Sequence, residues 1–380
     1  MSHRERCAAA VLSELIEPGQ LELYALVVEH GAAATLDRLL AAAGSVQLSR
    51  TAIAKLGRRD AYARGAELID QAQRCGARLL TPQDAQWPQQ LTDLASLSCD
   101  DCAAAPPIAL WLRGELPLRD VCQRSVSIVG ARAATSYGMH ATTELAAGLA
   151  RRGWTVISGA AYGVDGAAHR GALAAEGATV AVLACGVDRA YPAGHARLLQ
   201  RISETGLVIS EWPPASMPLR HRFLIRNRVI AALGRGVVVT EAARRSGSRV
   251  TARRAQELGR PVMALPGPVT SAMSVGPHEL IRDWQATLVT SAADVIAEVG
   301  SLGDVFAEQA ESGHADACND PDSQHARLLK AFPARQAASV EQLAASCRMT
   351  PRQVRGILPD LIMRRLIVNH PDGFARTTPS

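Results

Sequence analysis

Lysine is nearly absent from the sequence. Lys55 and Lys330 are the only two lysines, although lysine and arginine together number 41. Neither lysine follows a glycine, so the G-x-x-x-x-G-K-[ST] phosphate loop is missing and P-loop NTPase chemistry is excluded. Arginine prevails along the whole chain, which favours the coding bias of a GC-rich genome over selection for the forked phosphate contacts of guanidinium groups.

Long hydrophobic runs and paired cysteines are missing too. The richest apolar run, Ala103–Leu112, is interrupted by two prolines and is shorter than the roughly 18 residues of a membrane-spanning helix. The apolar stretch near the N-terminus stops at Glu14, so we expect no signal peptide. The eight cysteines include a single C-x-x-C, at Cys99 and Cys102, which leaves a zinc ribbon unsupported. We therefore expect a cytoplasmic protein with reduced thiols, no metal, no cofactor and no membrane partner.

The composition indicates a chain that folds along most of its length. Hydrophobic residues make up 48% and charged residues 20% of the 380, which suggests two or three domains with little disorder. Residues 1–72 are predicted to be helical, because apolar residues recur at helical spacing and Gly31 and Gly44 provide stops. This N-terminal helical domain is either a small nucleic-acid-binding unit or a packing unit.

Residues 73–300 alternate between buried strands and helices. The strand-like segments are Arg78–Leu80, Ile108–Leu112, Val126–Val129, Thr155–Ile157, Thr179–Leu183, Leu207–Ile209, Val237–Val239 and Val262–Leu265. Helix-length segments separate the later ones, at Met139–Arg152, Val164–Glu176, Ala193–Glu204, Phe223–Leu233 and Val250–Leu258. Strands that are apolar on both faces and alternate with helices predict an α/β fold with a Rossmann-like, doubly wound, mostly parallel sheet.

The C-terminal part is predicted to be a linker followed by a small domain. Residues 301–322 contain several acids but no arginine or lysine, which is typical of a linker. Residues 323–380 show three helical patterns and then a hairpin around Pro371-Asp372-Gly373. Thr350 is expected to cap the third helix. Three helices and a hairpin predict a winged-helix domain.

The loops that follow the strands are where a ligand of an open α/β sheet binds. Gly130 comes directly after a strand and lets backbone N–H groups approach an anion, and Arg132 adds a positive charge. The loop is not G-x-G-x-x-G, and Ser158-Gly159 rather than an acid ends the next strand. An NAD dehydrogenase is therefore disfavoured.

Two further loops have the small residues that an anion site needs. Ser158–Asp165 is rich in glycine and alanine, and Ser246-Gly247-Ser248 opens a helix with hydroxyls and free backbone donors. Asp165 and His169 lie one turn apart on a predicted helix. They form either a polar pair in a site or an N-cap with its helical neighbour.

Arg220–Arg228 is the most basic segment of the sheet region. Four arginines and Phe223 fall within it and no acid does, in a chain with only 4% aromatic residues. An aromatic ring that stacks on a base between guanidinium groups that hold phosphates is what single-stranded nucleic acid requires. The alternative is the start of an amphipathic helix with a buried Phe223.

A set of spaced motifs carries a family resemblance. In chain order they are Ser127–Arg132, Ser158–Asp165, Gly186-Val187-Asp188 with Tyr191-Pro192, Ser210-Glu211, Phe223 with Arg226-Asn227-Arg228, Ser246-Gly247-Ser248 with Thr251-Ala252, and Pro266-Gly267. In these motifs the sequence resembles the DNA-processing protein A family (DprA, also called Smf) over roughly residues 76–290. Departures from the family pattern are Ala131, Leu224, His278 and Gln285.

The resemblance implies a fold, a function and a set of partners. The fold would be an extended Rossmann-like domain between a SAM-like helical domain and a winged helix. The protein would bind single-stranded DNA, protect incoming DNA and load RecA recombinase during natural transformation, as a homodimer without catalysis, with single-strand-binding protein as a further partner. The binding residues carried over are Gly130, Arg132, Ser158, Gly159, Gly163, Arg222, Phe223, Arg226, Asn227, Arg228, Ser246, Gly247 and Ser248. In this scheme Arg132 holds a phosphate, Phe223 stacks on a base, and Arg222, Arg226 and Arg228 line the groove.

Two other functions remain open at this point. A nucleotide phosphoribohydrolase on a related fold would need P-G-G-x-G-T-x-x-E, which Pro266-Gly267-Pro268 does not provide. Glu241 could be an acid and Cys185 a nucleophile, but no evident base accompanies the thiol. A sequence-specific regulator would use Arg352 and Arg355 on the recognition helix of the winged domain, with Arg364 and Arg365 after it.

Overall fold

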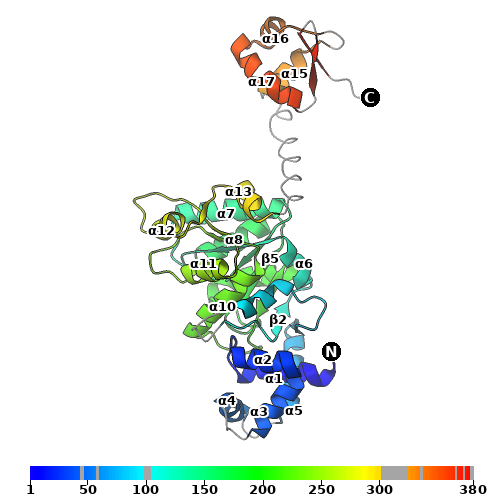
Figure 1. The fold of residues 1–380 in the computed structure, drawn as a ribbon, viewed down its shortest axis with the longest axis vertical. Coiled ribbons are helices and arrows are strands. Elements are labelled where there is room, and N and C mark those ends of the chain that lie inside the picture. Colours follow the sequence, from blue (N-terminus) through cyan, green and yellow to red (C-terminus); the bar gives the residue numbers. More distant parts are fainter. Residues whose placement is uncertain are drawn as a thin grey trace. The chain divides into compact units, whose positions relative to one another are not determined.

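The computed structural model describes residues 1–42, 47–56, 60–97, 104–300, 324–333, 337–363, 366–370 and 373–376. The chain forms two compact units, Met1–Val299 and Gly300–Ser380, each with a hydrophobic core of its own (Figure 1). The predicted linker at 301–322, Gly44, and the C-x-x-C at Cys99 and Cys102 lie outside the described residues.

Within the described part of the first unit, nine strands form one sheet in the order β1-β2-β6-β5-β4-β3-β7-β8-β9. They are β1 (Ala77–Leu80), β2 (Leu110–Arg113), β3 (Ser125–Val129), β4 (Thr155–Ser158), β5 (Thr179–Leu183), β6 (Leu207–Ser210), β7 (Val237–Val239), β8 (Val262–Ala264) and β9 (Thr287–Leu288). Strands β3 to β9 pair in parallel, and β1 and β2 add an antiparallel edge next to β6. The predicted doubly wound, mostly parallel sheet is confirmed.

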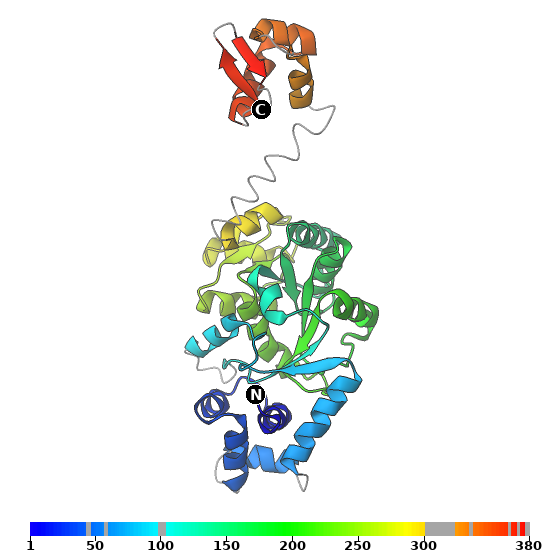
Figure 2. The same ribbon diagram turned by 90° about the vertical axis from the view of Figure 1, so that its right-hand side faces the viewer.

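Helices cover both faces of this sheet (Figure 2). Those after the edge strands are α6 (Leu118–Gln123), α7 (Ser136–Arg151), α8 (Val164–Ala174), α9 (Ala196–Thr205), α10 (Arg220–Leu233), α11 (Ser248–Glu257), α12 (Val275–Asp283) and α13 (Ala292–Val299). A 3₁₀ helix at Gln89–Ser96 lies between β1 and β2, and a shorter one at Ala193–His195 precedes α9. Val126 and Ile128 of β3 pack with α7 and α8, whereas Val129 packs on the side of α10. Both faces of the central strands are therefore buried, which is why they lack the polar alternation of a half-exposed sheet.

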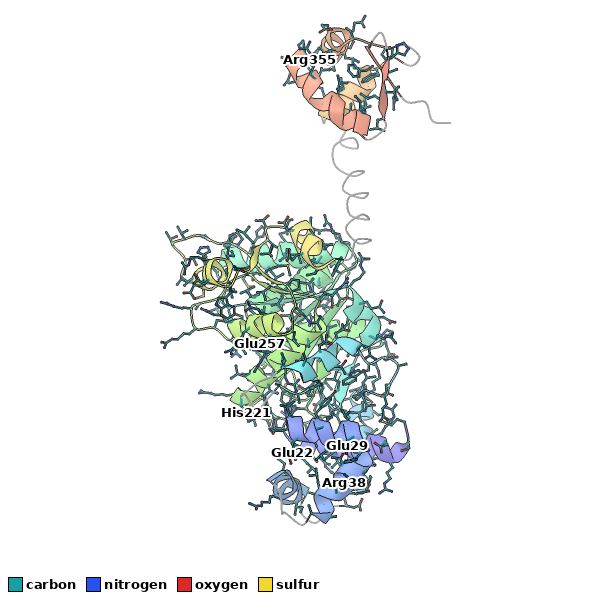
Figure 3. The ribbon with its side chains drawn as sticks, viewed as in Figure 1. Glu22, Glu29, Arg38, His221, Glu257 and Arg355 are labelled. Atoms are coloured by element: carbon teal, nitrogen blue, oxygen red, sulfur yellow. The ribbon has the colours of Figure 1, made fainter. Side chains whose placement is uncertain are left out.

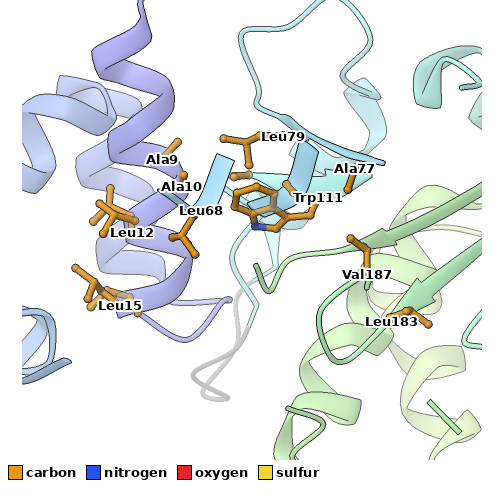
Figure 4. Close-up of a cluster of buried hydrophobic side chains, with 14 of the residues drawn as sticks. Ala9, Ala10, Leu12, Leu15, Leu68, Ala77, Leu79, Trp111, Leu183 and Val187 are labelled. Carbon is orange, nitrogen blue, oxygen red and sulfur yellow. The ribbon is translucent and has the colours of Figure 1, made fainter. Parts of the chain in front are cut away.

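The N-terminal helices pack onto the antiparallel edge of the sheet. They are α1 (His3–Leu15), α2 (Leu21–His30), α3 (Ala32–Ala41), α4 (Gln47–Leu56) and α5 (Ala61–Arg74). Trp111 of β2 is fully buried in the core cluster that joins Leu12 and Leu68 to the sheet (Figure 4). Its indole Nε1 donates to Ser13 Oγ at 3.2 Å. The helices and the sheet thus share one core, and the division at residues 72 and 73 stays a prediction.

The second unit contains α15 (Gln324–Ala331), α16 (Val340–Cys347), α17 (Pro351–Met363) and a hairpin of β10 (Ile367–His370) with β11 (Gly373–Arg376). The hydroxyl of Thr350 accepts from the backbone N–H of Gln353 at 3.3 Å, so the predicted cap is confirmed. Three helices followed by a hairpin is the element order predicted for a winged helix. Over the described ranges of both units, no helix is both long and apolar enough to cross a membrane.

Candidate nucleic-acid interface

A crevice lies at the topological switch point of the sheet, where the order in which strands are added reverses. Strands β3 and β7 are neighbours, yet the chain leaves β3 toward β4 and returns to β7 only after β6. The loops at their carboxyl ends consequently run to opposite sides, and ligands of open α/β sheets bind at such points. The loop beginning at Gly130 and the loop 240–247 flank the crevice from the two sides.

A cleft of about 700 Å³ occupies this place, and we term it the basic cleft. Its lining residues are Val129, Gly130, Ala131, Arg132, Ala133, Ala161, Asp165, Arg220, Phe223, Leu224, Arg226, Asn227, Ile230, Ala243, Arg245, Ser246, Gly247, Ser248, Thr251 and Met273. Three segments that sequence analysis treated separately therefore meet: the loop after β3, the start of α10 and the start of α11. Eight of the predicted binding residues lie there, namely Gly130, Arg132, Phe223, Arg226, Asn227, Ser246, Gly247 and Ser248.

Three exposed arginines give the basic cleft its charge. Arg132, Arg220 and Arg245 are exposed, and none forms an ion pair with a carboxylate that the structure describes. Arg220 and Arg245 are absent from the predicted site, although Arg220 begins the segment Arg220–Arg228 and Arg245 directly precedes Ser246-Gly247-Ser248. Their free guanidinium groups can hold phosphates without first breaking a salt bridge.

Phe223 lies in the first turn of α10, half-buried at the mouth of the cleft. The guanidinium carbon of Arg132 is 5.0 Å from the centre of its ring, and the ring of Tyr191 is 5.5 Å away on a tilted plane. Figure 3 labels the neighbouring, exposed His221 at this end of the helix. The ring is thus accessible beside a cation, so the alternative of a fully buried Phe223 is wrong.

Arg226 is a buried cation at the floor of the cleft. Its Nη1 donates to the carbonyl of Gly159 at 2.7 Å and also to the carbonyl of Val182. Burial lowers the pKa of Arg226 to about 10, which leaves the group charged at neutral pH. Asp165 is the one carboxylate among the described lining residues, and burial raises its pKa above the usual value. The arginines of the cleft therefore outnumber its one described carboxylate.

Glycines at 159 and 163 permit this arrangement. A Cβ at Gly159 would collide with the guanidinium of Arg226. Gly163 has φ of +75°, and a Cβ there would meet the carbonyl oxygens of Ala131 and Arg132. Neither glycine lines the basic cleft; each allows two protein segments to pack closely.

Hydrogen bonds fix the loop before α11. The amide Nδ2 of Asn227 donates to the carbonyl of Gly247 at 3.2 Å, and the hydroxyls of Ser246 and Ser248 lie 2.8 Å apart. This ties the Ser-Gly-Ser loop to α10, so the two walls of the basic cleft are held in a fixed relation.

Besides Gly159 and Gly163, the predicted contact residues Ser158, Arg222 and Arg228 do not line the cleft. The hydroxyl of Ser158 is fully buried and donates to the carbonyl of Ile128 at 2.6 Å. Arg228 is 1% exposed and its Nη2 lies 2.7 Å from Glu211 Oε1. Arg228 and Ser158 are therefore core residues, and the prediction that Arg228 lines the groove is corrected.

Arg222 joins α10 to the N-terminal helices instead of lining the cleft. Its Nη2 lies 2.5 Å from Glu17 Oε1 and its Nε donates to Glu17 Oε2 at 3.2 Å. Trp212 Nε1 donates to the same carboxylate at 3.0 Å. Burial alone would raise the pKa of Glu17, but these hydrogen bonds outweigh it and hold the pKa below 4.5. The carboxylate is therefore a charged anchor for the start of α10.

Glu241, Cys185 and His169, which the sequence offered as candidate site residues, are each held in contacts that stabilise the fold. Glu241 accepts from the backbone N–H of Thr135 at 2.8 Å and from its hydroxyl at 2.6 Å, at the beginning of α7. Burial raises the pKa of Cys185 to about 11, so its thiol is neutral. His169 is fully buried with Nδ1 2.7 Å from Thr179 Oγ1, and burial lowers its pKa to about 3. His169 therefore does not act with Asp165 in the cleft.

The fold and the cleft define a class: a doubly wound α/β protein with an arginine-lined cleft at the switch point of its sheet. The family described as DNA recombination-mediator protein A matches residues 78–300. The chain belongs to this family, as the sequence motifs predicted.

Named relatives agree with this membership. The chain is 43% identical over 356 residues to a DNA processing protein DprA of Mycobacterium tuberculosis, which covers 92% of this chain and 89% of the relative. It is 43% identical over 192 residues to the DNA processing protein DprA of Streptococcus pneumoniae, covering 50% of this chain and 67% of the relative. The solved structure of DNA processing protein A from Streptococcus pneumoniae superposes with a TM-score of 0.64 at 29% identity, over 79% of this chain and 99% of that chain.

Proposed function

We propose that the protein binds single-stranded DNA in the basic cleft. The observation that carries this proposal is the half-buried ring of Phe223 beside three exposed arginines that have no described carboxylate partner. Guanidinium groups hold successive phosphates while an aromatic face stacks on a base, and every base has such a face, so binding needs no particular sequence.

We also propose a wider role, which family membership supports. The protein would protect incoming DNA in the cytoplasm and load RecA recombinase onto it during natural transformation, acting as a homodimer and without catalysis. Single-strand-binding protein would be a further partner. Support comes from the names of the relatives, which are DNA processing proteins.

An equilibrium titration tests the binding proposal. Fluorescence anisotropy of labelled oligothymidylate and of a duplex of equal length is measured at two salt concentrations. We expect tighter binding of the single strand and a steep salt dependence. Phe223→Ala is expected to weaken single-strand binding by about 1–3 kcal/mol.

Two results would overturn the proposal. One is equal affinity for single strand and duplex, together with no effect of Phe223→Ala. The other is loss of all binding when residues 323–380 are deleted, which would favour a winged-helix regulator. The side chain of Arg352 and residues Arg364 and Arg365 lie outside the described part of the chain, and Arg355 pairs with Glu341 at 3.1 Å.

A further inference from the structure

A second, smaller cavity adjoins the basic cleft at the carboxyl ends of β4 and β5. It has a volume of about 70 Å³, and we term it the aromatic pocket because Tyr162, Tyr191 and Phe223 line it. Arg132 and Phe223 line both cavities. Ala161 and Arg226 line both as well, so the contact between Arg132 and Phe223 lies where the pocket meets the cleft.

The aromatic side chains of the pocket are unusually exposed. Tyr162 is 51% and Tyr191 40% exposed. The chain has five tyrosines and four phenylalanines, and three of these line this one pocket. Exposed rings gathered in one concavity, in a chain so poor in aromatics, indicate a surface that covers a flat ligand.

Tyr162 is held in place from two sides. Its ring meets the ring of His195 edge-on, with centres 4.9 Å apart and planes at 70°. Its hydroxyl lies over Gly194, where a Cβ would come within 2.7 Å of the oxygen. A ring that is already ordered loses little entropy when it stacks on a ligand.

The floor of the pocket is uncharged. Leu183, Ala184 and Cys185 form it, and the raised pKa of Cys185 leaves the thiol neutral. Positive charge is found only at the side shared with the basic cleft, on Arg132 and Arg226. An apolar floor with cations at the mouth suits a neutral ring that is joined to a phosphate outside.

We propose that one unpaired base of the bound strand passes Phe223 and enters the aromatic pocket alongside Tyr162 and Tyr191. This inference rests on the proposed function, because the strand must first lie in the basic cleft. A base inside a duplex could enter only after unpairing and unstacking, which costs a few kcal/mol. The pocket therefore supplies a preference for unpaired DNA that does not depend on charge.

A double-mutant cycle between protein and DNA tests the pocket. Tyr162→Ala and the wild-type protein are titrated with oligothymidylate and with an abasic oligonucleotide of equal length. We expect Tyr162→Ala to bind oligothymidylate about tenfold more weakly and the abasic strand with unchanged affinity, since the latter has no base to insert. Tyr162→Phe keeps the ring and is expected to bind like the wild type.

The matched control is Tyr137→Ala, since Tyr137 is 42% exposed and lines neither cavity. If Tyr162→Ala does not fold, Tyr162→Leu removes the aromatic face with less loss of packing. Equal weakening toward both oligonucleotides, or no weakening toward either, would overturn the pocket while leaving single-strand binding intact. Failure of the wild type to prefer a single strand would instead overturn the proposed function itself.

Discussion

Replacing Arg228 distinguishes a core arginine from a DNA-binding one. Arg228 is 1% and Glu211 4% exposed, and their charged atoms are 2.7 Å apart. Burial raises the pKa of Glu211 although Arg228 acts in the opposite direction. An unpaired charge at this position is therefore strongly unfavourable. Arg228→Ala leaves the carboxylate buried without its partner, and breaking such a pair costs about 3–5 kcal/mol.

Urea unfolding measures this loss, and a salt titration of oligothymidylate binding follows on the folded variant. We expect the free energy of unfolding to fall by the amount above, with the salt slope of binding unchanged. The double variant Arg228→Met, Glu211→Leu is the control, because replacing both charges by apolar groups restores much of the stability. An Arg228→Ala variant of full stability with a reduced salt slope would refute the placement of Arg228 in the core.

Three further predictions concern the cleft, its anchor and the second unit. Arg132→Ala and Arg245→Ala are each expected to reduce the salt slope of single-strand binding by about 0.7. Each should change the free energy of unfolding by less than about 0.5 kcal/mol. Arg253→Ala is the control, because Arg253 lies outside the cleft and its replacement should leave the salt slope unchanged. Glu17→Gln should lower the free energy of unfolding at pH 7 by about 1–2 kcal/mol. Because the folded-state pKa of Glu17 lies below 4.5, the wild type keeps this stabilisation above pH 4.5 and loses it as the pH falls further, and the variant should show a flatter acid limb in urea titrations. Deleting residues 323–380 should preserve most single-strand affinity in a filter-binding assay.

Each of the first two predictions has an outcome that would contradict it. Equal salt slopes for Arg132→Ala and Arg253→Ala would remove Arg132 from the interface. An acid limb of Glu17→Gln as steep as that of the wild type would mean that Glu17 is not held ionised by its partners.

The central strands were predictable because burial on both faces requires mostly apolar residues at successive positions. Val126–Val129 and Thr179–Leu183 are such runs, and both are strands in the structure. Short elements without a strong pattern escaped prediction, as with α6 and the 3₁₀ turn at Gln89–Ser96. Their conformation depends on packing against distant segments.

The arginines of α10 could not be sorted from sequence. Arg222 and Arg228 look alike in the segment Arg220–Arg228, but Glu17 binds the first and Glu211 the second. Glu17 is 205 positions away from Arg222, and no local sequence pattern indicates such a distant partner.

The sequence likewise did not identify Tyr162 as a candidate binding residue, because its loop consists mostly of small residues. What the sequence did offer was the scarcity of aromatics, which made Phe223 informative.

Photo-cross-linking tests most directly where the strand lies. The full-length protein is irradiated with oligothymidylate in which one thymine is replaced by iodouracil, and the adduct is located by peptide mass spectrometry. Covalent attachment at Phe223, Tyr191 or Tyr162 is the result that we predict. Attachment confined to residues 324–376, with none on the first unit, would contradict the account.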